Sequence, residues 1–168
     1  IRLSLVGSEM CIRDRLALRP TILRGNASEI LALAGGDTTA RGVDAADPVM
    51  AAEPAARALA MQTGGVVVVT GAIDLVTDGA RVATITGGSP LMPQVTALGC
   101  SLTCLIGSYA AVAAPLEAAV AALVLFAHAG ERAGREAEGP GSFGWRFLDA
   151  LAATSPAELA ATERVTWG

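Results

Sequence analysis

Three short segments of this 168-residue chain carry side chains that can bind an anion or a metal ion. In the first segment, Asn26 and Glu29 stand three positions apart, directly after Arg24 and Gly25. Amide and carboxylate oxygens suit Mg²⁺, which also keeps several waters, so the pair can serve a metal beside a phosphate group. The same spacing is typical of a helix cap, in which both side chains bond backbone amides. The residues alone favour the cap and leave the metal as the alternative.

The second segment runs from Thr70 to Asp74 and follows a run of four valines. The hydroxyl group of Thr70 and the glycine Gly71 follow the predicted strand here. Gly71 has no side chain and allows a phosphate to approach the backbone closely. A turn at the end of a strand explains the same residues without any ligand. The structural role is the favoured interpretation of this segment.

The third segment, from Thr96 to Cys100, leads into a predicted helix. The backbone N–H groups around Leu98 and Gly99 face out of the helix start, where the helix dipole favours an anion. We therefore predict an anion hole at these two residues. A helix start also stabilises a thiolate, so Cys100 is the candidate reactive cysteine, whereas Cys104 is interpreted as a core residue.

The elements that position these segments alternate between strands and helices, which predicts the α/β class. The valine run 66–69 has no polar alternation, as in a strand of a parallel sheet that is covered on both faces. The Asp78-Gly79 turn predicts a hairpin of strands 74–77 and 81–85. We expect a parallel-rich sheet flanked by helices, with ligands beyond the carboxyl ends of its strands. Further predicted helices span 30–33, 48–61, 100–112, 116–129, 145–153 and 156–162, with a linker at 139–144.

Composition and charge exclude several classes of partner. The net charge is -4, and all twelve cations are arginines, so no basic field is available for a nucleic acid. No charged residue lies between Val82 and Leu116, but glycines and prolines break this stretch. We therefore expect buried helices and no membrane partner, with a membrane hairpin over 95–130 as a weak alternative. Three cysteines without disulfide spacing fit a reducing, cytoplasmic location.

Four segments follow one another in a specific order and spacing: Pro20–Ile30, Gly42–Asp44, Val69–Asp74 and Val95–Cys100. Together they resemble the hydroxyethylthiazole kinase family, and the resemblance extends from Leu16 to the end of the chain. The resemblance implies a ribokinase-like fold and ATP- and Mg²⁺-dependent phosphorylation of the hydroxyl of 4-methyl-5-(2-hydroxyethyl)thiazole. This is a salvage step of thiamine phosphate biosynthesis. It also implies that the full-length protein is a homotrimer with sites at subunit contacts.

The resemblance assigns roles to individual residues of the three segments. It places Arg24 and Thr70 against ATP, and it favours magnesium over the cap for Asn26 and Glu29. Cys100 matches the position at which many relatives in the fold carry an aspartate base, near the substrate hydroxyl.

Position 97 is a departure from the family pattern. The family is expected to have a substrate-contacting glycine there, and this chain has Ala97. A backbone contact with the substrate would survive the added methyl group.

Residues 1–15, IRLSLVGSEMCIRDR, lack the alanine richness of the remainder. They resemble a translated sequencing adapter, so we expect them to be an artefact and give Cys11 no weight. Residues 16–168 are then the C-terminal portion of one ribokinase-like kinase domain, an incomplete copy without the N-terminal part of the thiazole pocket. Two alternatives remain open. One is a ribokinase-like kinase for a pyridoxal or hydroxymethylpyrimidine alcohol, and the other is a non-catalytic fragment that binds nucleotide.

Overall fold

The computed structural model describes residues 16–35 and 48–168. Five strands form one sheet in sequence order: β1 (Ile22–Asn26), β2 (Val66–Thr70), β3 (Asp74–Thr77), β4 (Val82–Ile85) and β5 (Val165–Trp167). The helices are α2 (Ala27–Leu33), α3 (Pro48–Ala51), α4 (Glu53–Thr63), α5 (Leu98–Ala110), α6 (Pro115–Glu136), α7 (Pro140–Ala153) and α8 (Pro156–Ala160), with a 3-10 turn η1 (Met92–Gln94). Residues 1–15 and the segment 42–44 lie outside the described residues, so their predictions stay predictions.

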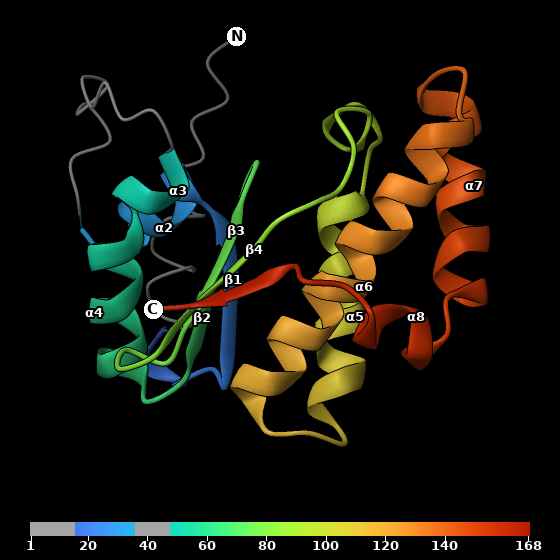
Figure 1. Cartoon of the computed structure of the whole chain (residues 1–168). Coiled ribbons are helices and arrows are strands. Elements are labelled where there is room, and N and C mark those ends of the chain that lie inside the picture. The colour runs from blue at the N-terminus through green and yellow to red at the C-terminus, as the bar shows by residue number, and fades with distance from the viewer. Residues whose placement is uncertain (1–15, 36–47) are drawn as a thin grey trace, which may run out of the picture.

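The sheet separates two hydrophobic cores, and β2 contributes to both of them. Val67 and Val69 pack with α2, α3 and α4, whereas Val66 and Val68 pack with α5, α6 and α7. All four valines are buried, which confirms the predicted strand with two covered faces. Figure 1 shows the two groups of helices on opposite sides of the sheet, with α7 outside α6.

The α/β class is confirmed, but the expectation of a parallel-rich sheet is wrong for the described residues. Only β1 and β2 pair in parallel there, and the other three strand pairs are antiparallel. For the pairs β2–β3 and β3–β4, the physical reason is the short length of the connections. Three residues join β2 to β3, and the Asp78-Gly79 turn helps join β3 to β4, whereas a parallel pair requires a long crossover.

One edge of the sheet collects all three sequence segments. The parallel strands β1 and β2 both end there, at Asn26 and Thr70. Asp74 begins β3 at the same edge, because β3 runs antiparallel to β2 and Leu75 pairs with Val69. The chain then passes through residues 86–97 and enters α5 at Leu98. The topology therefore gathers residues that are far apart in the sequence.

Several element predictions are confirmed and others need correction. The hairpin and the two long apolar helices are present, with a break before Pro115. The expected linker at 139–144 is wrong, because α7 already begins at Pro140, a residue that suits the first turn of a helix. Cys104 is exposed and is not a core residue, since α5 buries Leu102 and Ile106 instead. Among the described residues, no helix is long and apolar enough to cross a membrane.

Candidate functional site

A cavity of about 820 Å³ opens at the edge where β1 and β2 end. Five of the eight residues predicted for the site line it: Arg24, Asn26, Thr70, Leu98 and Gly99. The other three are not among its lining residues, namely Glu29, Ala97 and Cys100. The structure therefore brings the predicted ATP-contacting residues and the predicted anion hole to one place.

The guanidinium group of Arg24 lies between the end of β2 and the start of α5. Its Nη2 atom donates a hydrogen bond of 2.9 Å to Oγ1 of Thr70. A Cβ atom on Gly99 would lie only 2.8 Å from Nη1 of Arg24, so the guanidinium packs directly on the helix backbone. Among the described residues Arg24 forms no ion pair, and its Nε atom is buried without a hydrogen-bond partner. A half-buried cation that forms no close ion pair with a described carboxylate favours an incoming anion.

The first turn of α5 adds a second source of positive potential. No side chain of the described residues caps this helix, and its N-cap residue Ala97 has φ 69° and ψ 4°, in the left-handed region. The first N–H groups of a helix have no partner within the helix, and the dipole makes them a binding site for anions. The left-handed backbone also gives a physical reason for the glycine expected at position 97, since glycine adopts it without steric cost.

Asn26 and Glu29 form a complete capping box at the start of α2. Oδ1 of Asn26 accepts a hydrogen bond from the Glu29 amide at 2.9 Å, and Oε2 of Glu29 accepts one from the Asn26 amide at 2.8 Å. Ser28 also donates to Oδ1 of Asn26, at 2.8 Å. The cap interpretation is confirmed, and the magnesium role stays a prediction.

The same two side chains remain compatible with a magnesium ion. Oε1 of Glu29 takes part in no hydrogen bond within the described part of the chain, and a carboxylate offers about four acceptor positions. Both side chains are exposed, and Asn26 lines the cavity. No cluster of three or more His, Cys, Asp or Glu side chains occurs among residues 16–35 and 48–168. This sparse donor set fits an ion that keeps most of its waters.

Asp74 is a residue of the cavity that the sequence analysis treated only as part of a turn. Burial raises the pKa of its carboxyl group to about 6, against the opposing effects of the Gly71 amide and of Arg24. Its Oδ1 atom accepts a hydrogen bond of 3.0 Å from the Gly71 amide. The predicted turn after the valine strand was the available signal, because it returns the chain so that the first residue of β3 lies beside the end of β2.

Gly71 has a structural reason to be glycine. A Cβ atom at this position would collide with Cγ2 of Val49 in α3. Its N–H group is already bonded to Asp74. These contacts favour the structural role of the turn over a close approach of phosphate.

Cys100 occupies the first turn of α5 and is exposed. It follows Gly99, which contacts Arg24, so the thiol lies on the helix turn that borders the cavity. Its sulfur is not turned inward among aliphatic side chains. The proposed catalytic role of Cys100 stays a prediction.

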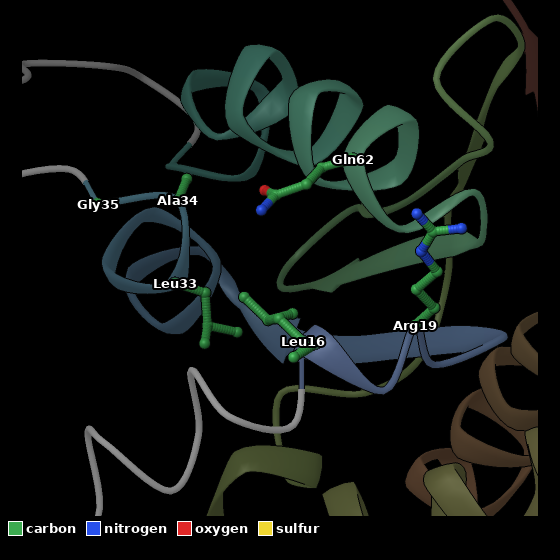
Figure 2. Close-up of a pocket in the computed structure, with 7 residues that line it drawn as sticks. Leu16, Arg19, Leu33, Ala34, Gly35 and Gln62 are labelled. Atoms are coloured by element: carbon green, nitrogen blue, oxygen red, sulfur yellow. The ribbon is translucent and has the colours of Figure 1, made fainter.

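A second pocket, of about 580 Å³, lies beside α2, α4 and the segment before β1. Figure 2 shows Leu33 and Gln62 bordering it from these helices, with Leu16 and Arg19 on the segment before β1. None of the residues predicted for the site lines this pocket. The cavity at the edge of the sheet is therefore the candidate site.

The fold and the cavity define an α/β protein that presents an arginine and a helix start to an anion. A family model described as the hydroxyethylthiazole kinase family matches residues 8–156. The chain belongs to the hydroxyethylthiazole kinase family, and its fold is ribokinase-like.

Two relatives and one solved structure illustrate this membership. A hydroxyethylthiazole kinase of Gemmatimonas aurantiaca is 74% identical over 155 residues, which are 92% of this chain and 56% of that protein. One of Rhizobium rhizogenes is 62% identical over 156 residues, covering 92% of this chain and 58% of that protein. The structure of the hydroxyethylthiazole kinase protein from Pyrococcus horikoshii matches with a TM-score of 0.79 and 33% sequence identity. The match covers 91% of this chain and 57% of the Pyrococcus horikoshii chain. The chain thus spans little more than half the length of these relatives.

Proposed function

We propose that this chain carries the nucleotide-binding part of a kinase that phosphorylates the hydroxyl of 4-methyl-5-(2-hydroxyethyl)thiazole with ATP. The product would feed thiamine phosphate biosynthesis. The observation that carries the proposal is the placement of Arg24 against Gly99, where an arginine without an ion pair in the described chain meets an uncapped helix start. Both groups line a cavity large enough for a small-molecule ligand.

In this proposal Arg24 holds the phosphates of ATP. Its five N–H donors match phosphate oxygens, and its bond to Thr70 fixes its direction. The backbone N–H groups of Leu98 and Gly99 receive the negative charge of the transferring group. Phosphoryl transfer requires this alignment and charge neutralisation more than covalent help from the protein.

Asn26 and Glu29 would hold Mg²⁺ through its bound waters. The ion supplies positive charge that offsets the charge of the phosphates. The capping box gives both side chains a fixed direction at the cavity edge, because each accepts a hydrogen bond from the backbone.

The thiazole alcohol would approach from the side of Ala97 and Cys100. Cys100 would orient the attacking hydroxyl or accept its proton, and Ala97 would contact the substrate through its backbone. We expect orientation to be the larger contribution, because phosphoryl transfer depends mainly on the alignment of the reacting groups. We further propose that the full-length protein acts in the cytoplasm as a homotrimer.

Turnover by the 168-residue chain tests the proposal. The chain would be incubated with MgATP and the thiazole alcohol, and thiazole phosphate would be measured, with pyridoxal and hydroxymethylpyrimidine as competing acceptors. Formation of thiazole phosphate in preference to the other products is expected. Preferential phosphorylation of another acceptor would contradict the substrate assignment.

A second candidate function is nucleotide binding without turnover. It is favoured by the share of the relatives that the chain spans, 56% and 58% for the two named above. Calorimetric titration with MgATP separates the two candidates, because binding with no thiazole phosphate formed supports the second. An absence of binding would overturn both.

A further inference from the structure

One wall of the cavity is a loop that the site predictions did not include. We define residues 86–92 as the wall segment, which runs from the end of β4 to Met92, the first residue of η1. It faces the side of the cavity that carries Arg24 and Thr70, since both sets of residues line the same space. The lining residues that it contributes are Gly87, Gly88, Ser89, Pro90 and Met92.

Two glycines of α6 allow the wall segment to approach this helix closely. A Cβ atom on Gly130 would lie 2.7 Å from Sδ of Met92 and 3.3 Å from the Cα atom of Gly88. A Cβ atom on Gly134 would lie 2.5 Å from Oγ of Ser89. The two glycines are four residues apart and share one face of the helix. Larger residues at these positions would displace the wall segment.

An ion pair holds the other end of the wall segment. Arg164 donates to Glu131 through Nη1 and Nη2, with both N–O distances 2.6 Å. The backbone of Arg164 also accepts a hydrogen bond of 3.0 Å from the Thr86 amide. A Cβ atom on Gly87 would collide with Nη1 of Arg164. The bidentate pair is therefore in contact with the wall segment itself.

We propose that Glu131 and Arg164, together with Gly130 and Gly134, are positioning residues that fix the wall segment and thereby set the affinity of the cavity for nucleotide. The identity of the ligand rests on the proposed function. Bidentate pairing restricts the guanidinium in distance and in orientation, so it holds the adjoining backbone firmly. A misplacement of about 1 Å in a binding wall is enough to lower affinity strongly. Arg164 also lies beyond residue 156, where the family match ends.

The ion pair is tested with Glu131→Gln in the 168-residue chain. This change keeps the size of the side chain and removes its charge. The matched control is Glu117→Gln, which breaks another pair of α6 with an arginine, Arg81 at 3.2 Å, on an exposed surface. We expect Glu131→Gln to raise the Kd for MgATP about 3- to 10-fold by calorimetry, whereas the control changes it less than about twofold.

The close approach to α6 is tested by size complementation. Gly134→Ala is expected to raise the Kd for MgATP about 3- to 10-fold without lowering the Tm, because alanine favours a helix over glycine by about 1 kcal/mol. Adding Ser89→Gly removes the side chain that the new methyl group meets. The double variant should then bind MgATP with the Kd of the Ser89→Gly single variant, a rescue that a purely structural role would not produce.

The outcomes separate this inference from the proposed function. If the unsubstituted chain does not bind MgATP, the proposed function fails, and the nucleotide role of the wall segment fails with it. If the unsubstituted chain binds, but Glu131→Gln matches its control and Gly134→Ala changes nothing, only the positioning inference is overturned. Should Glu131→Gln fail to fold, the Gly134→Ala and Ser89→Gly variants decide.

Discussion

The helices α2 and α5 both begin at the same edge of the sheet, and their first turns are built differently. At α2, Asn26 and Glu29 satisfy each other's backbone N–H groups. At α5, Ala97 provides no side-chain cap, and the cation of Arg24 lies beside the uncapped turn. The first arrangement stabilises a helix by itself, whereas the second leaves positive potential that an anion can neutralise. The comparison indicates that the backbone N–H groups at the α2 start find partners in its own first turn, whereas the α5 start is left open to an anion.

Removal of the Arg24 side chain is the strongest test of the binding role of α5. Charge-assisted hydrogen bonds to phosphate contribute about 2–3 kcal/mol, so Arg24→Ala should raise the Kd for MgATP about 30- to 160-fold. Arg57→Ala, in a surface ion pair of α4, is the matched control. Titration calorimetry measures both variants. Equal affinity of Arg24→Ala and the control would remove the anion site from this edge.

Asp74 lines the same cavity, where its carboxylate form would repel an anion. Its pKa is raised by burial from 3.8 to about 6, so the folded chain penalises the charged form. The stability contributed by the neutral group is fully present below pH 4 and is lost as the pH rises through 6. Asp74→Asn should therefore become more stable than the unsubstituted chain across this window, by roughly 2–3 kcal/mol at pH 7. Urea unfolding at pH 4 and pH 7 measures this, and a constant difference would contradict it.

Gly99 tests whether the contact between Arg24 and α5 matters for binding. A methyl group there would push against the guanidinium, so Gly99→Ala should raise the Kd for MgATP about tenfold. Alanine favours the helix, so the Tm should not fall. In the Arg24→Ala background the same change should have little effect. Full additivity of the two substitutions would show that they act independently.

The capping box can be separated from the magnesium role at α2. Asn26→Ala should lower the free energy of unfolding by about 1 kcal/mol, through loss of the cap. Glu29→Gln preserves a capping box, since glutamine also serves at this position, but removes the charge that a metal requires. We expect an unchanged Tm for Glu29→Gln and a requirement for several-fold more Mg²⁺ in ATP binding. An unchanged Mg²⁺ requirement would leave Glu29 with the cap alone.

The smallest effect is expected at Ala97, the left-handed residue before α5. A left-handed backbone costs alanine about 1 kcal/mol or more, and glycine avoids this steric cost. Part of the gain is lost, because glycine gives up more conformational entropy on folding than alanine. Ala97→Gly should therefore raise the free energy of unfolding by about 0.5 kcal/mol, measured by urea denaturation. A decrease would mean that the strain at Ala97 is absent.

Local patterns predicted the parts of this protein that depend on neighbouring residues. The Asn26 cap, the valine strand and the Asp-Gly hairpin were all found, because propensity and hydrogen bonding over a few residues decide them. The strand β5 was missed, since Val165–Trp167 is too short to give a periodic signal. The exposure of Cys104 was also missed, because it depends on which face of α5 meets the core.

The sequence by itself determined the α/β class, the family and the three segments that carry polar side chains. Only the tertiary structure decided that Arg24 packs on Gly99, that Asp74 lies half-buried beside them, and that Arg164 pairs with Glu131. These contacts join residues of distant elements, so they depend on sheet order, register and helix packing. Such long-range geometry is set by the burial of both faces of the sheet, which no short segment encodes.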